Sequence, residues 1–359
     1  MNAVPSPAPR VSVLVTTHNG APWLGATLDS VLAQDFRDFE LVVVDDASTD
    51  RTPVLLAGYA ARDHRVRVLT APRNLGVVGA RNHGFAACRG ENVALLDHDD
   101  LSRPGRLGAQ VAHLDAHPEV VLLGTGVMVD TDGRLRPDPP APCDPLGLRW
   151  ALHLGNPLTW SSVMLRGTVA RRLRPFLRAE YEYADDFDLY HRMLGLGAAA
   201  RLDAPLTVYR WHRSNTTHRE AGPLFDRAVA VLARAYRLWL GTDAADGAAL
   251  AVRHLSHRQP VRDLATLDRV GQVCWSACST ASPQDFRRPN ARRSRPRPRP
   301  LGGTLSGARR GRGCREPCDI SGGDRRCARD PPPRRRTARR RSRSASSVRA
   351  ARGGRSLRV

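Results

Sequence analysis

The stretch ELVVVDDASTD, residues 40–50, decides the fold class of this sequence. Its apolar run, Leu41–Val44, has no polar position and ends at two aspartates. A run of this kind predicts a strand that is buried on both faces of a sheet, as the strands of parallel sheets are. The stretch ENVALLDHDD, residues 91–100, repeats the pattern, because the apolar run Val93–Leu96 also ends at acidic residues.

Strand patterns alternate with helix patterns over the first 130 residues. In the segment Trp23–Gln34, the apolar residues Leu24, Leu28 and Val31 recur at helical spacing. The predicted strands are Val11–Thr16, Leu41–Val44, Val66–Leu69, Val93–Leu96 and Val120–Val129, and the predicted helices are Trp23–Gln34, Asp50–Arg62, Val77–Cys88 and Pro104–Ala116. This alternation predicts an α/β fold with a mostly parallel sheet flanked by helices.

The rest of the chain contains fewer predicted strands. The sequence Asp130–Gly133 is typical of a hairpin turn that reverses the chain. Further strands are expected at Ser161–Leu165 and Leu206–Trp211, and helices at Asp185–Leu194, Pro223–Leu240 and 247–270.

The positive charge is concentrated at the C-terminal end. The 359 residues have a formal net charge of +21, and residues 274–359 hold 25 of the 56 basic residues but 5 of the 35 acidic ones. That segment is rich in Arg, Pro and Ser, so we expect it to be disordered. Because apolar periodicity ends abruptly there, we also hypothesise that it is GC-rich DNA read out of frame. The predicted domains are an α/β domain over 1–222, a helical extension over 223–273 and the tail over 274–359.

Composition argues against several classes of protein. No apolar run reaches the roughly 20 residues that span a bilayer, and MNAVPSPAPR at the N-terminus lacks the pattern of a secretory signal peptide. Of the seven cysteines, only Cys88 and Cys143 precede the tail, so we expect no disulfide framework. These features predict a cytoplasmic protein, and a peripheral membrane contact through the amphipathic region 223–270 stays open.

Acidic residues after the predicted strands are candidates for a metal site. Asp45 and Asp46 follow one strand, and Asp97 and Asp99 end another. Ligands bind beyond the carboxyl ends of parallel strands, so both groups reach the edge where a site is expected. Asp97 and Asp99 lie two residues apart in an extended chain and can share Mg²⁺ or Mn²⁺. Turn formation is the alternative, but two such groups at strand ends favour the metal site.

A third acidic group, DDFD at residues 185–188, opens the predicted helix at 185–194. Acidic residues in a first helical turn are favoured by the helix dipole, so capping is one explanation. The other is catalytic, because Tyr181, Tyr183 and Phe187 provide an apolar wall. Such a wall raises the pKa of a carboxyl group towards the working range of a general base.

The sequence resembles the family 2 glycosyltransferases, which have the GT-A fold. The resemblance covers about residues 10–220 and rests on motifs in the order and spacing of that family: VSVLVTTHNG (11–20), ELVVVDDASTD (40–50), RNLGVVGARNHGFAACRGENVALLDHDD (73–100), ADDFDLYHR (184–192) and YRWHRSN (209–215). It implies a metal-dependent hexosyltransferase that moves a sugar from a UDP-, dTDP- or GDP-sugar to an acceptor hydroxyl with inversion. The implied acceptor is a saccharide or a lipid-linked molecule in cell-envelope or exopolysaccharide synthesis.

The resemblance also implies roles for individual residues around the donor. By matching position these are Thr16 and Asp46 for the base and ribose, Arg81 and Asp97 for the diphosphate, and Asp97, Asp99 and His212 for Mn²⁺ or Mg²⁺, with Asp100 beside them.

Asp186 is the implied base that deprotonates the acceptor. The family usually has Glu-Asp where this chain has Asp185-Asp186, so the base assignment stays open between these two residues.

Other functions fit the sequence less well. A sugar-1-phosphate nucleotidyltransferase has a similar sheet, but its Gly-rich basic loop is replaced by THNGAPW at 17–23. A dinucleotide oxidoreductase would need a GxGxxG motif after the first strand, which is absent. The Arg-rich tail would bind nucleic acid or other polyanions through charge, but its few aromatic residues argue against specific nucleic-acid recognition.

Overall fold

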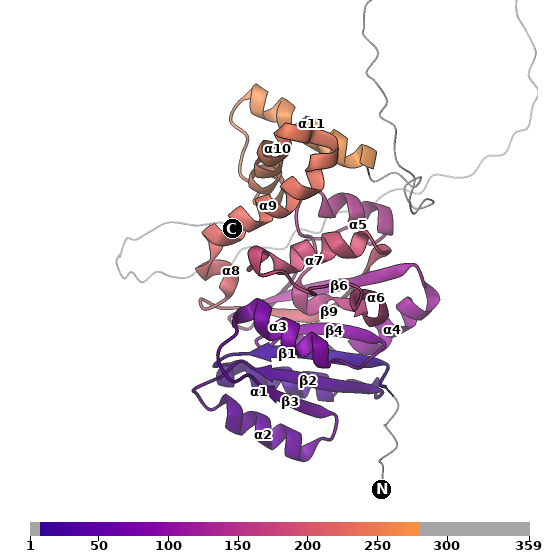
Figure 1. Cartoon of the computed structure of the whole chain (residues 1–359), viewed down its shortest axis with the longest axis vertical. Coiled ribbons are helices and arrows are strands. Elements are labelled where there is room, and N and C mark those ends of the chain that lie inside the picture. Colours follow the sequence, from indigo (N-terminus) through magenta and orange to yellow (C-terminus); the bar gives the residue numbers. More distant parts are fainter. Residues whose placement is uncertain (1–7, 281–359) are drawn as a thin grey trace, which may run out of the picture. The chain divides into compact units, whose positions relative to one another are not determined.

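The computed structural model describes residues 8–280. These residues form a nine-stranded sheet of order β3-β2-β1-β4-β8-β6-β9-β5, with β7 paired to β6 (Figure 1). The strands are β1 (Val11–Thr17), β2 (Phe39–Asp45), β3 (Val66–Thr70), β4 (Asn92–Asp97), β5 (Leu101–Ser102), β6 (Val120–Thr131), β7 (Arg134–Pro137), β8 (Met164–Arg166) and β9 (Ala198–Trp211). The α-helices are α1 (Ala21–Leu32), α2 (Thr52–Arg62), α3 (Gly76–Ala87), α4 (Arg106–Ala116), α5 (Pro145–Leu152), α6 (Gly167–Ala170), α7 (Asp185–Leu194), α8 (Thr216–Arg219), α9 (Ala221–Leu240), α10 (Ala244–Leu250) and α11 (Leu264–Thr280).

The sheet is parallel on one side and mixed on the other. Strands β3, β2, β1 and β4 are parallel neighbours, as the buried apolar runs predicted. Strand β8 then pairs antiparallel with both β4 and β6, whereas β6 and β9 are parallel. The predicted α/β fold is confirmed, and its sheet is mixed.

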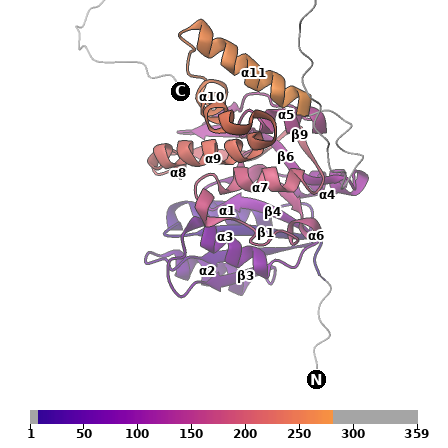
Figure 2. The ribbon, with the colours of Figure 1, turned by 45° about the horizontal axis from the view of Figure 1, so that its top comes forward.

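Helices cover both faces of the sheet (Figures 1 and 2). Alternate residues of a strand point to opposite faces, and in β1 the side chains of Val13 and Val15 enter one buried cluster while Leu14 enters the other. The first cluster includes α1, α2 and α4, and the second includes α3, α7 and α9. The predicted α7, Asp185–Leu194, agrees with the structure at both ends.

A glycine allows α3 to lie close to the sheet. A Cβ atom at Gly84 would overlap Leu14 Cδ1 and lie 2.7 Å from Val44 Cγ2. Arg81 is three residues earlier and therefore shares this side of the helix. The close approach brings Arg81 over the ends of the parallel strands.

The predicted turn at Asp130–Gly133 is confirmed. It joins β6 to β7 as an antiparallel hairpin. Asp132 and Gly133 have φ angles of 52° and 80°, and the Gly133 N–H donates to Asp130 Oδ1 at 2.8 Å. This left-handed backbone is the reason for a glycine at the second position.

The prediction of one helix over 247–270 is wrong. Helix α10 ends at Leu250 and continues as the π-helical turn η4 (Ala251–Ser256), and α11 begins only at Leu264. Pro260 lies in the break, where it lacks an N–H donor and disfavours helical backbone in the residue before it. Helix α11 runs past the predicted boundary at residue 274 to Thr280, and the rest of the predicted disordered tail lies outside the described residues.

None of the helices in residues 8–280 is both long enough and apolar enough to cross a membrane.

Candidate active site at the carboxyl edge of the sheet

The ends of β1, β2 and β4 bring three predicted site residues to one edge. Thr16 in β1 is the register partner of Asp97 in β4. Asp46 follows β2, and its backbone N–H donates to the Thr17 carbonyl at 2.8 Å. The Asp46 Oδ1 atom accepts the N–H of Leu75 at 2.7 Å, which ties this edge to the loop before α3.

Asp97, Asp99 and Asp100 form an acidic triad at the end of β4. A carboxylate oxygen from each lies within 4.8 Å of the others. Asp100 is buried; its Oδ1 accepts the backbone N–H of Arg210 at 2.9 Å, and its Oδ2 has no partner among the described residues. Burial, and then the charges of Asp99 and Asp97, hold the pKa of Asp100 well above its usual value. Burial also raises the pKa of Asp97, although Arg81 opposes that shift.

His212 joins this triad from the segment after β9. Its Nε2 lies 3.1 Å from Asp99 Oδ2, and its Nδ1 lies 2.8 Å from Ser214 Oγ. The ring stacks on Trp23, with centroids 4.7 Å apart, and Asn215 Nδ2 is 3.4 Å from the same Asp99 oxygen. The structure thus brings the predicted His212 and Asp99 together. Trp23, Ser214 and Asn215 are not among the predicted site residues, although the last two lie within the motif at 209–215.

Arg81 connects the triad to α7. Its Nη2 donates to Asp97 Oδ1 at 2.9 Å, and its Nη1 donates to Asp185 Oδ2 at 2.8 Å. The guanidinium carbon lies 3.9 Å from the ring centre of Trp160, which is not among the predicted site residues. Burial alone would lower the pKa of Arg81, but Asp185 and Asp97 raise it on balance. Arg81 therefore keeps its positive charge between the two acidic groups.

Asp185 and Asp186 differ in their partners. Asp185 is 2% exposed and ion-paired with Arg81. Asp186 instead accepts from neutral donors, Asn156 Nδ2 at 2.9 Å and the Phe187 N–H at 2.6 Å. Burial and the charge of Asp185 raise the pKa of Asp186 to about 7, against the opposing effect of the guanidinium. Asp186 thus has a raised pKa and no salt bridge among the described residues, whereas Asp185 is held in an ion pair by Arg81. No pattern in the sequence points to Asn156.

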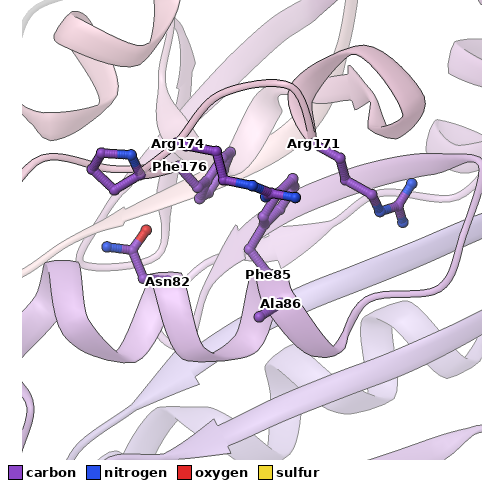
Figure 3. Close-up of a pocket in the computed structure, with 7 residues that line it drawn as sticks. Asn82, Phe85, Ala86, Arg171, Arg174 and Phe176 are labelled. Atoms are coloured by element: carbon purple, nitrogen blue, oxygen red, sulfur yellow. The ribbon is translucent and has the colours of Figure 1, made fainter.

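A separate hollow of about 420 Å³ lies farther along α3 (Figure 3). Asn82, Phe85 and Ala86 line it from α3, and the segment after α6 contributes arginines and a second phenylalanine. The rings of Phe85 and Phe176 stack with centroids 3.7 Å apart in its wall. None of the predicted site residues lines this hollow, so it is distinct from the carboxyl-edge site.

Comparisons with known proteins identify relatives of this chain. The family model described as Glycosyl transferase family 2 matches residues 12–168. EpsE of Bacillus subtilis, whose name gives it as a glycosyltransferase, is 31% identical over 196 residues, or 53% of this chain and 68% of that protein. The succinoglycan biosynthesis protein ExoO of Rhizobium meliloti is 41% identical over 126 residues, or 35% of this chain and 36% of that protein.

A solved structure shares the fold. The crystal structure of residues 1–349 of TarS from S. aureus, in complex with UDP-GlcNAc, has a TM-score of 0.55 to this chain at 19% sequence identity. The match covers 76% of this chain and 82% of that one, which agrees with the expected GT-A-like arrangement of sheet and helices.

Proposed function

The chain belongs to glycosyl transferase family 2, and on that basis we propose that it transfers a sugar from a nucleotide-diphosphate donor to an acceptor hydroxyl with inversion, in a metal-dependent reaction. The observation that carries the proposal is the position of Arg81, which hydrogen-bonds to Asp97 of the acidic triad and to Asp185 of α7. The triad suits a cation, and Asp186, next to Asp185, suits a proton. TarS was crystallised with UDP-GlcNAc and ExoO is named for succinoglycan biosynthesis, which supports a nucleotide-sugar donor and an acceptor in polysaccharide synthesis.

The triad fits a hard divalent cation such as Mn²⁺ or Mg²⁺. Its carboxylate oxygens converge, and the buried Oδ2 of Asp100 has no protein partner among the described residues. A buried acceptor of this kind is costly unless something satisfies it. Asp97 and Asp99 would hold the ion, with Asp100 behind them and His212 as a further ligand. When bound, the ion would supply positive charge for the departing diphosphate.

Arg81 and the strand ends bind the donor in this proposal. The buried guanidinium is fixed between two carboxylates, so it is already oriented when negative charge develops on the diphosphate. Thr16 and Asp46 lie at the same edge of the sheet and would contact the base and ribose. Asp185 positions Arg81 and is not itself the base.

Asp186 accepts the proton. Its carboxylate, with a pKa of about 7, removes the proton of the acceptor hydroxyl while the hydroxyl oxygen attacks the anomeric carbon. The carbon–oxygen bond to the diphosphate breaks in the same displacement, which inverts the anomeric configuration. Holding donor and acceptor in line supplies much of the remaining acceleration.

Thermal unfolding of the full chain tests the donor site. We expect UDP, GDP or dTDP to raise the midpoint only in the presence of Mn²⁺, with one base preferred. A ligand at 100 times its dissociation constant stabilises a protein by about 2.7 kcal/mol, a shift of about 5 °C at this size. If no nucleoside diphosphate shifts the midpoint with Mn²⁺ present, the proposal fails. A response to nucleoside triphosphates alone would instead favour the nucleotidyltransferase alternative.

A further inference from the structure

The imidazole of His212 is held both on its face and at its edge. Its ring is nearly parallel to that of Trp23, with centroids 4.7 Å apart and an angle of 8° between the two planes. At the edge, Nε2 lies 3.1 Å from Asp99 Oδ2 and Nδ1 lies 2.8 Å from Ser214 Oγ. The edge contacts direct the two nitrogens within the plane of the imidazole, whereas the indole fixes the plane itself.

Trp23 is placed by contacts with the site rather than by the core. It is the third residue of α1 and is half-buried, and neither apolar cluster of the core in residues 8–280 includes it. The guanidinium carbon of Arg210 lies 5.1 Å from the centre of the Trp23 ring, and its Nη2 donates to the Trp23 carbonyl at 3.2 Å. The same guanidinium donates from Nε to the Asp99 carbonyl. Arg210 therefore ties the tryptophan to the loop that carries the acidic triad.

The contact with Trp23 does not depend on what Nε2 binds. A neutral histidine ligates a metal ion through the lone pair of one ring nitrogen, while the other nitrogen carries the proton. If Nε2 is the ligand, its hydrogen bond with Asp99 gives way and Nδ1 donates to Ser214. A hydroxyl can donate or accept, so Ser214 suits either tautomer. The stack on Trp23 involves neither nitrogen and therefore keeps the plane of the ring in both states.

We propose that Trp23 is a positioning residue, which holds the imidazole of His212 in the plane where Nε2 can ligate the cation of the acidic triad. This inference rests on the metal site of the proposed function and adds a residue that acts on the cation only through His212. A ligand side chain that is already fixed loses less conformational freedom when the cation binds. Removal of the indole should therefore weaken cation binding, as loss of the groups that orient metal ligands does.

Titration of the full chain with Mn²⁺ tests the proposal without an assay of sugar transfer. Free Mn²⁺ is followed by its paramagnetic resonance signal, with and without UDP. We expect Trp23→Leu to weaken Mn²⁺ binding about tenfold, and Trp23→Phe, which keeps an aromatic face, to weaken it by less than about threefold. Trp275→Leu removes a 76% exposed indole from α11 and is the matched control, with the affinity of the wild type expected. If Trp23→Leu melts at a lower temperature than the wild type, Trp23→Met, whose flexible side chain refills the space, repeats the measurement.

A double-mutant cycle distinguishes a positioning role from a general effect on the structure. In the background of His212→Ala there is no imidazole to hold, so Trp23→Leu should weaken Mn²⁺ binding by less than about twofold there. Equal losses in the two backgrounds would show that Trp23 acts independently of His212 and would overturn the proposal. Wild-type affinity in Trp23→Leu would overturn it as well.

The same titrations separate this inference from the proposed function. Wild-type affinity in His212→Ala would remove the imidazole from the metal site and overturn the inference, while the acidic triad would still bind the cation. If the wild-type chain binds no Mn²⁺ either with or without UDP, the metal dependence of the proposed function fails and the inference fails with it.

Discussion

Replacing Asp186 by Asn removes the proposed proton acceptor and little else. The side chain keeps its size, and its amide oxygen can still accept one of the two hydrogen bonds that Asn156 and Phe187 donate. A positioned general base contributes about 10² to 10⁴ in rate, so kcat should fall by that factor. Donor binding should be unchanged, since the salt bridges of Arg81 run to Asp185 and Asp97.

The pH dependence of the wild-type enzyme gives an independent measure of the same group. Burial and the charge of Asp185 raise the pKa of Asp186 to about 7. A base with that pKa is ionised in about 9% of molecules at pH 6 and about 91% at pH 8, so kcat/KM for the acceptor should rise about tenfold between them. Asp185→Asn removes the repelling charge, which lowers the pKa of Asp186 and moves the rise to lower pH.

The assay is release of nucleoside diphosphate at saturating donor over a range of acceptor concentrations, which gives kcat and kcat/KM, with donor affinity measured separately by calorimetry in Mn²⁺. Glu180→Gln, an exposed carboxylate shortly before α7, is the control and should behave as wild type. Transfer that survives in Asp186→Asn and is lost in Asp185→Asn would identify Asp185 as the base. A flat profile between pH 6 and pH 8, with chemistry rate-limiting, would contradict the raised pKa.

Other substitutions have equally definite expectations. Asp99→Asn should abolish Mn²⁺-dependent binding of the nucleoside diphosphate, measured by calorimetry, and normal binding would remove Asp99 from the metal site. The pKa of Asp100 is raised in the folded state, so its ionisation destabilises the fold as pH rises. Asp100→Asn should therefore raise the melting temperature at pH 8 without metal. The same substitution should weaken Mn²⁺ binding. Burial lowers the pKa of His191 to about 4, so the folded state loses stability as pH falls below about 6.5. Between pH 8 and pH 5, the free energy of unfolding of His191→Leu, measured by denaturant titration, should therefore fall by about 2 kcal/mol less than that of the wild type.

The parallel half of the fold could be predicted because its strands are buried on both faces. An uninterrupted apolar run such as Leu41–Val44 is typical of a strand buried on both faces. Strand β2 begins and ends within two residues of that run. Strand β9 was only half predicted, because its first residues, Ala198–Ala200, lack the β-branched side chains that mark a strand. The break before α11 was missed because the apolar spacing continues across Pro260.

The candidate site also contains residues that the sequence predicted and residues that it did not. Asp97, Asp99 and Asp46 follow strands, so the sheet alone brings them to one edge. Asn156 and Trp160 come from the segment between α5 and β8, whose position depends on tertiary packing, and no local sequence pattern predicts it. Contacts of this kind join residues far apart in the chain, and a single amino-acid sequence carries no local signal for them.

The choice between Asp185 and Asp186 depends on a tertiary contact, the ion pair between Arg81 of α3 and Asp185 of α7. Adjacent residues on a helix point about 100° apart, so only one of the two can face Arg81. Gly84 lets α3 sit low enough on the sheet for that guanidinium to reach Asp97 and Asp185 together. A side chain that only has to meet a nearby guanidinium can be Asp where the family usually has Glu. The shorter carboxylate that left the base undecided in the sequence is therefore consistent with a positioning role for Asp185 and with our proposal that Asp186 accepts the proton.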